Sequence, residues 1–151
     1  MSHDARLRQL NITLPDAPMP AANYVPFVQS GKLLFVSGQI AAGPEGLIRG
    51  RLGEDMDVAQ GAAAARACGL ALIAQARAAL GSLDGIVRVV KLTGFVNSTP
   101  EFTEQPEVIN GCSDLMVEIF GEAGRHARAA VSAAALPRGV AVEIEAIFET
   151  A

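Results

Sequence analysis

The sequence has few of the residues that build metal centres or disulfide frameworks. It contains only two cysteines and two histidines among 151 residues. Cys68 and Cys112 stand far apart, each in an apolar, helix-like pattern, so we interpret them as buried reduced thiols. Beyond His3 and His126, Asp or Glu would have to supply most ligands of a metal ion, and no spacing suggests such a site. We therefore expect no bound metal.

Clustered positive charge is also lacking. The formal net charge is −4, and the 12 Lys and Arg residues are scattered in ones and twos. Nucleic-acid binding needs a basic stripe that neutralises phosphates, so nucleic acid is not an expected partner. The N-terminus lacks a basic region followed by an apolar one, and no apolar run reaches the ~18 residues that span a bilayer. We expect a cytoplasmic protein without a membrane partner.

The length and apolar content indicate one domain over residues 1–151. A chain of 15.7 kDa with half its residues apolar can bury one substantial core but has little room for a second. Residues 1–23 are largely polar and carry three prolines. This segment is interpreted as an irregular N-terminal arm that lies over the surface or frays.

The first half of the chain predicts a hairpin, a loop and a helix. Residues 24–30 and 33–40 are β-rich runs around a Gly-Lys turn, and a proline in the first run makes it an edge strand. Residues 41–55, with four glycines and a proline, indicate a loop with at most a short strand at 47–51. Small and apolar residues then recur at helical spacing from Asp57 to about Leu80, before Gly81.

The second half predicts a strand over 86–96, a helix near 106–121, and two strands over 128–135 and 140–149. Thr99 is expected to cap the helix, with Pro100 at its first position. The turn at 136–139 predicts that the last two strands pair as a hairpin. The resulting order, β-β-(β)-α-β-α-β-β, indicates an α+β fold with two helices on one face of a mixed sheet.

The last strand alternates apolar and mixed positions. Alternate residues of a strand point to opposite faces, so Ile144 lies on one face, and Glu143 and Ile147 lie on the other. A face that holds Ile147 is partly apolar, and a second subunit would cover it.

Arg128 and Glu143 stand out because their surroundings are apolar. In the simplest hairpin register, Ser132 faces Glu143 and Arg128 faces Ile147, which places both charged groups on one face. One interpretation is structural, a diagonal ion pair from Arg128 to Glu145 or Glu149. The other is an anion site, in which the guanidinium binds a carboxylate with two hydrogen bonds and Glu143 orients a water molecule.

Two other sequence patterns are only weak indications of function. Ser37-Gly38-Gln39 is not a nucleophile elbow, because that motif needs glycine two positions before the serine, and position 35 is Phe. Glycines 43, 46 and 50 do not match a phosphate-binding motif and are interpreted as turn residues.

Two blocks resemble the signatures of the Rid family of reactive-intermediate deaminases, also called YjgF-like or endoribonuclease L-PSP. They are Leu33-Leu-Phe-Val-Ser-Gly-Gln-Ile40 and the block from Arg128 to Ile147, which includes Leu136-Pro137 and Val142-Glu-Ile-Glu-Ala146. The resemblance implies a chorismate-mutase-like α+β fold and a homotrimer with small-molecule clefts between subunits. It also implies hydrolysis of 2-imino acids, or their enamine tautomers, to 2-oxo acids and ammonia, with neither metal nor organic cofactor.

The resemblance also suggests residue roles. Arg128 matches the arginine that binds the substrate carboxylate, and Glu143 matches the glutamate that positions or activates water. The remaining matches are Tyr24 lining the cleft, Ser37 and Gly38 at its floor, and Asn110 near the pocket.

Three departures from the family pattern favour a divergent subgroup with a reshaped pocket. Ala130 stands where many members have cysteine, and Ala22-Asn23 replaces a Gly-Pro pair. An insertion-like segment, residues 121–126, ends at His126, which we consider as a further cleft residue. The natural substrate need not be a simple imino acid.

Three functions remain open from the sequence. The first is a deaminase that acts on a small carboxylate. The second is a small-carboxylate-binding or regulatory protein of the same fold without turnover, which the altered pocket rim favours. The third is an endoribonuclease, against which the acidic balance argues.

Overall fold

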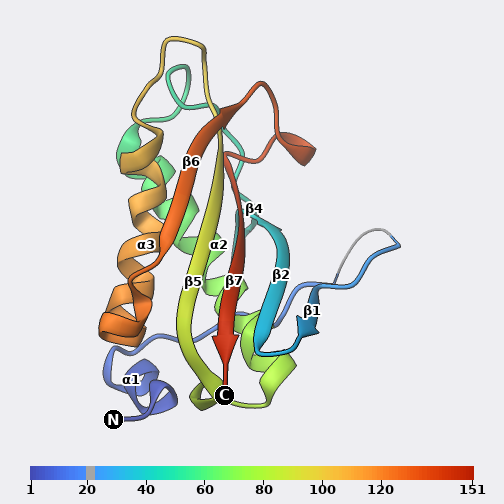
Figure 1. Cartoon of the computed structure of the whole chain (residues 1–151). Helices are drawn as coiled ribbons and strands as arrows, with labels where there is room; N and C mark the ends of the chain where they lie inside the picture. Colours follow the sequence, from blue (N-terminus) through green and yellow to red (C-terminus); the bar gives the residue numbers. More distant parts are fainter. Residues whose placement is uncertain (20–22) are drawn as a thin grey trace.

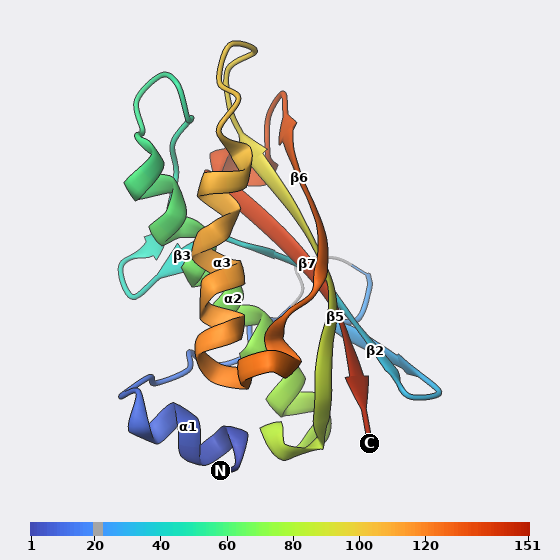
Figure 2. The ribbon, with the colours of Figure 1, turned by 60° about the vertical axis from the view of Figure 1, so that its left-hand side comes forward.

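The computed structural model describes residues 1–19 and 23–151, and its centre is a five-stranded mixed sheet with the order β1-β2-β7-β5-β6. Two long helices, α2 and α3, lie side by side on one face of this sheet, and both termini lie at the same end of the molecule (Figures 1 and 2). The other face is open. The predicted α+β class and the placement of both helices on one face are confirmed.

The elements follow the predicted order. They are α1 (His3–Gln9), β1 (Phe27–Ser30), β2 (Leu33–Ile40), β3 (Ala42–Gly43), β4 (Gly46–Leu47), α2 (Val58–Leu80), β5 (Ile86–Asn97), α3 (Gln105–Phe120), β6 (Ala127–Ala133) and β7 (Val142–Thr150). Three short 3-10 helices are η1 (Leu83–Gly85), η2 (Gly121–Gly124) and η3 (Pro137–Gly139). The hairpin of β1 and β2 is confirmed, with β1 at the sheet edge. The short strand expected at 47–51 is instead β4, which ends at Leu47.

Helix α2 begins and ends at the residues that the sequence indicates. The Asp57 side chain accepts a hydrogen bond from the Gln60 backbone, and the Gln60 side chain accepts one from the Asp57 backbone, which completes a capping box. Gly81 ends the helix with φ of +79°, a conformation that glycine adopts at little cost.

The predicted start of α3 is wrong. Thr99 and Pro100 belong to a loop, and the helix begins at Gln105. The Thr99 backbone N–H donates to the carbonyl of Leu52 at 3.0 Å, which holds this part of the chain in an extended bridge beside residues 50–52. Pro106 occupies the first turn instead, where its missing N–H costs nothing.

The predicted hairpin of the last two strands is also wrong. Strand β5 lies between β6 and β7, parallel to β6 and antiparallel to β7 (Figure 1). Residues 134–141, which include η3, carry the chain across β5 rather than around a tight turn. As the longest strand, with apolar residues on both faces, β5 suits the interior of the sheet better than its edge.

The N-terminal arm is not frayed. The Ser2 hydroxyl caps α1 by accepting from the Ala5 N–H, and Leu7 is buried in the core. Asp4 accepts a hydrogen bond from the Ser82 hydroxyl at 2.6 Å, and the Arg6 Nε donates to the Glu118 carbonyl at 2.9 Å. The expectation of an irregular arm over 1–23 is therefore corrected for residues 3–9, which form α1, whereas residues 12–19 have no regular secondary structure. Pro20, Ala21 and Ala22 lie outside the described residues, so the Ala22 departure has no structural account.

Helix α2 is the core helix. By length and mean hydropathy (1.2) it could cross a bilayer, but 56% of its most apolar window is buried inside the protein. Both cysteines are free and buried, as predicted, with Cys68 on α2 and Cys112 on α3. Burial raises the pKa of Cys112 to about 12, so this thiol stays protonated and unreactive.

Small residues let α2 and α3 approach each other closely. A Cβ atom at Gly111 would overlap the backbone carbonyl of Ala62, and one at Gly69 would press on the side chains of Leu115 and Cys112. At Gly111 the obstacle is backbone, which cannot move aside unless the helices separate. Only glycine therefore fits at this crossing.

The substitution Gly111→Ala should destabilise the protein. Alanine gains about 1 kcal/mol of helix propensity, but the backbone overlap forces the helices apart, and overpacking of this kind costs about 1–3 kcal/mol. We expect a net loss in the free energy of unfolding, measured by denaturant titration. Asp114→Ala, at an exposed position of the same helix, should change it by less than about 0.5 kcal/mol. An unchanged or higher midpoint for Gly111→Ala would contradict the packing described here.

Candidate functional site

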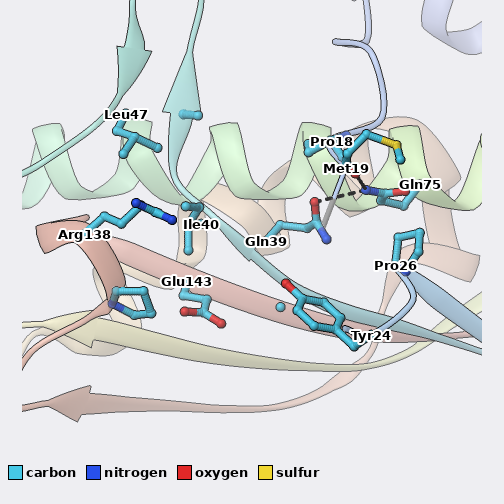
Figure 3. A pocket seen from close by; sticks show the side chains of 13 residues that line it. Pro18, Met19, Tyr24, Pro26, Gln39, Ile40, Leu47, Gln75, Arg138 and Glu143 are labelled. Atoms are coloured by element: carbon cyan, nitrogen blue, oxygen red, sulfur yellow. Dashed lines mark hydrogen bonds between the residues drawn. The ribbon is translucent and has the colours of Figure 1, made fainter. Parts of the chain in front are cut away.

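A cavity of about 390 Å³ opens where β2, β7, α2 and the N-terminal arm meet (Figure 3). Its lining residues come from segments far apart in the sequence, and are Pro18, Met19, Tyr24, Pro26, Gly38, Gln39, Ile40, Ala42, Leu47, Gln75, Pro137, Arg138 and Glu143. Three of these, Tyr24, Gly38 and Glu143, were predicted as site residues from the sequence. We call these three residues, with the cavity around them, the cavity half-site.

Glu143 supplies the carboxylate of the cavity. It projects from β7 on the open face of the sheet, where it is half-buried. Desolvation by burial raises the pKa of this carboxyl above its ordinary value, and the nearby Glu145 raises it further. A carboxylate with a raised pKa accepts a proton from water more readily than an ordinary one. Glu143 therefore has the chemistry of a general base.

Gly38 makes room for this carboxylate. Strand β2 has a register shift between Val36 and Gln39, and Gly38 lies within it. A Cβ atom at Gly38 would overlap Oε2 of Glu143. Ser37, the other predicted floor residue, does not line the cavity. Its hydroxyl donates to the Val25 carbonyl at 2.8 Å, which secures the segment that carries Tyr24.

Two glutamines form a polar wall that the sequence analysis missed. Gln75 on α2 is 1% exposed, and its Nε2 donates to the Pro18 carbonyl at 2.7 Å and to Oε1 of Gln39 at 3.4 Å. These bonds tie the N-terminal arm to the cavity. The sequence did contain a signal for this wall, because Gln75 is an amide inside an otherwise apolar stripe of small residues. A polar side chain buried in such a stripe needs hydrogen-bond partners.

Arg128 lies elsewhere, on the outer strand β6, with its side chain against α3. One guanidinium nitrogen donates to the Ser113 hydroxyl at 3.1 Å and the other to the Pro106 carbonyl at 3.3 Å. Asn110 is exposed on the same helix, at a spacing that places it on the face of Pro106 and Ser113. We call Arg128, Ala130, Asn110 and the groups that hold the guanidinium the arginine half-site.

His126 belongs to this hydrogen-bonded chain rather than to the cavity. Its Nδ1 lies 2.6 Å from the Gly124 carbonyl, which can only accept, so Nδ1 carries the proton. Its Nε2 then accepts from the Ser113 hydroxyl at 2.9 Å, and that oxygen accepts from Arg128. Burial lowers the pKa of His126, and Arg128 lowers it further against the bond to Gly124, which favours the neutral ring that this arrangement needs.

Arg128 and Glu143 lie on opposite faces of the sheet. Leu92 of β5 pairs with Arg128 and points to the helices, whereas Phe95 pairs with Glu143 and points to the open face. The shared face inferred from the hairpin register is therefore wrong, because β5 separates the two strands. Neither Glu145 nor Glu149 pairs with Arg128, since no carboxylate of the described residues lies within 4.0 Å of it. One chain thus carries two half-sites that cannot meet around one small ligand.

The open face of the sheet is partly apolar. Paired positions bring together Val28, Phe35 and Ile147 in one place and Phe95 and Val131 in another. Charged side chains share this face, and they are Lys91, Glu143, Glu145 and Glu149. Val28 is 52% exposed and Phe35 41%. The partly apolar face expected around Ile147 is confirmed. Contiguous apolar patches of this kind are typical of protein interfaces.

The sequence was compared with known proteins. Residues 4–146 match the family described as "YjgF/chorismate mutase-like, putative endoribonuclease". Protein TCP17 of Trypanosoma cruzi is 54% identical over 147 residues, which covers 96% of this chain and 92% of that protein. A RutC family protein of Pyrococcus horikoshii is 28% identical over 142 residues, covering 87% of this chain and 90% of its own.

Solved structures show the same fold. Atu1372 of Agrobacterium tumefaciens, a protein of unknown function, is 50% identical with a TM-score of 0.91, covering 99% of this chain and 92% of that one. An endoribonuclease-named protein of Shewanella oneidensis is 34% identical with a TM-score of 0.94 and 99% coverage of both chains. Escherichia coli TdcF with bound serine is 29% identical with a TM-score of 0.62, covering 89% and 94%.

The substitution Gly38→Ala should move the Glu143 carboxylate without unfolding the protein, because the new methyl group meets the flexible end of a side chain. Moved toward solvent, the carboxyl loses the desolvation that raises its pKa, so the pKa falls toward its ordinary value. Carboxyl NMR titration measures this shift. Glu145→Gln should lower the same pKa by less, since burial is the larger cause. An unshifted Glu143 in Gly38→Ala would refute the contact.

Proposed function

Because the chain belongs to the YjgF/chorismate mutase-like family, we propose that it hydrolyses 2-imino acids, or their enamine tautomers, to 2-oxo acids and ammonia. We further propose that the reaction takes place in clefts between the subunits of a homotrimer. The single observation that carries the proposal is the separation of Arg128 from Glu143 on opposite faces of one sheet.

A neighbouring copy would complete the site. The arginine half-site lies at the β6 edge, and the cavity half-site opens near the other side of the sheet. Subunits arranged head to tail around a closed ring would bring one half-site of each copy against the other half-site of the next. The apolar side chains of the open face, which include Phe35 and Val131, supply surface for the contact.

The chemistry needs little beyond positioning. A protonated imine is already electrophilic, so holding it beside a water molecule supplies much of the rate. Arg128 would bind the substrate carboxylate through two hydrogen bonds, oriented by Ser113. Glu143 would accept a proton as water attacks the imine carbon and would return it to the nitrogen. The carbon–nitrogen bond then breaks, and the proton that remains on the oxygen passes to the departing ammonia. The oxygen of that water becomes the oxygen of the new carbonyl.

The relatives support a small-molecule ligand. TdcF of Escherichia coli holds serine, a small amino acid, in its solved structure. A binder without turnover would use the same two half-sites, and the assay below separates it from an enzyme. The endoribonuclease function has less support, since the chain has a net charge of −4 and scattered basic residues. The two free, buried thiols suit the reducing cytoplasm, where we place the protein.

A coupled assay tests the proposed reaction. An amino-acid oxidase produces 2-iminopropanoate from alanine, and semicarbazide traps whatever is not hydrolysed. The parent protein should reduce trapping, whereas Arg128→Ala should lower its catalytic efficiency about 10- to 100-fold, because a charge-assisted carboxylate contact is lost. Arg125→Ala, which removes a nearby exposed arginine paired only with Glu122, should match the parent. A parent protein without effect on trapping would exclude this activity.

A mixing experiment tests the shared cleft. Arg128→Ala and Glu143→Gln are each expected to have little activity alone, but subunits unfolded and refolded together should form mixed oligomers. In a closed ring, roughly a quarter of the clefts then combine an intact arginine with an intact glutamate, so activity returns. Arg128→Ala mixed with the double variant offers no intact pair and should stay inactive. If the first mixture also stays inactive, the two residues do not act across a subunit boundary.

A further inference from the structure

A second arginine, Arg138, lines the cavity and so lies in the cavity half-site, whereas Arg128 does not. It belongs to η3, and Figure 3 shows it at one end of the cavity with Tyr24 at the other. Glu143 lies between them. A cation therefore stands across the cavity from the aromatic side chain, beside the group proposed to activate water.

The backbone fixes this arginine in an uncommon conformation. Arg138 has φ of +58°, and the only other described non-glycine residue with positive φ is Asn11. A residue with a side chain adopts this conformation at an energetic cost, which the surrounding structure must offset. Arg49 contributes to this, because its Nε donates to the Arg138 carbonyl at 2.8 Å. The turn thus fixes the backbone from which the exposed side chain of Arg138 reaches the cavity.

Arg138 has no carboxylate partner in the part of the chain that the structure describes. The ion pairs found there join Arg66 to Glu118 and Arg125 to Glu122, and Glu143 is not within 4.0 Å of Arg138. Residues 20–22, Pro-Ala-Ala, carry no charged side chain. A guanidinium that lines a cavity without a counterion is available to bind an anionic group of a ligand.

We propose that Arg138 binds a second anionic group of the substrate, so that the site prefers imines of dicarboxylic amino acids over imines with neutral side chains. This inference rests on the proposed function. Arg128 of the neighbouring copy would hold the carboxylate next to the imine carbon, and Arg138 would hold the side-chain carboxylate. Water replaces the imine nitrogen with oxygen and ammonia leaves, while the second carboxylate is unchanged.

The first test compares two imines in the trapping assay, one produced from glutamate and one from alanine by the corresponding oxidases. The parent should act more efficiently on the glutamate-derived imine. Arg138→Gln should lower that efficiency about tenfold or more, a typical effect of losing a charge-assisted contact, and change the alanine-derived reaction less than about twofold. Glutamine is unbranched like arginine, so it meets the positive φ at a similar cost. Arg8→Gln removes the same charge on α1 and should leave both rates unchanged.

The second test does not depend on turnover. Calorimetry compares glutarate, a dicarboxylate, with pentanoate, which has the same number of carbons and one carboxylate. The parent should bind glutarate about tenfold or more tightly than pentanoate, and Arg138→Gln should remove that difference. If the protein shows this difference in binding but has no activity in the trapping assay, the inference about Arg138 stands and the proposed reaction is rejected. Equal binding of the two acids by the parent, or equal weakening of both by Arg138→Gln, would overturn the inference.

Discussion

The double pairing of β5 is the constraint on which the rest of this architecture depends. By binding β6 on one side and β7 on the other, it fixes the order of the sheet and fills the space that a hairpin of the last two strands would occupy. The same pairing directs Arg128 toward α3 and Glu143 toward the open face. Two charged residues that are close in sequence thereby serve different surfaces, and a complete small-molecule site becomes a property of an assembly rather than of a chain.

Much of the fold follows from local patterns in the sequence. The start of helical spacing at Asp57, the glycine stop at Gly81 and the alternation along β7 are each recognisable within a few residues, and each is found where it was predicted. The start of α3 could not be predicted in this way. Thr99 is a plausible helix cap, but its backbone hydrogen bond to Leu52 keeps it in the loop before the helix. That bridge joins segments far apart in the chain, and no local pattern contains it.

The site was predictable in part for the same reason. Apolar surroundings singled out Arg128 and Glu143, and a family resemblance indicated Tyr24 and Gly38. Three of these four residues, Tyr24, Gly38 and Glu143, line the cavity. Their mutual placement was not predictable, since a turn such as 136–139 is equally compatible with a hairpin and with a crossover. Gln75 and Arg138 were missed because their significance comes from the arm and the cavity that they face, which only the folded chain brings together.

The attachment of the N-terminal arm has a consequence for how this protein can be altered. Pro18 and Met19 form part of the cavity wall, and the segment that carries them is anchored on one side by α1 and on the other by Gln75. Most of the core lies in α2, α3 and the sheet, and the N-terminal arm adds Leu7 and Leu14 to it. Proteolytic removal of the arm would therefore remodel the pocket and also take Leu7 and Leu14 out of the core. Substitutions at Pro18 and Met19, which lie outside that core, give evolution a means of changing ligand preference at little risk to folding.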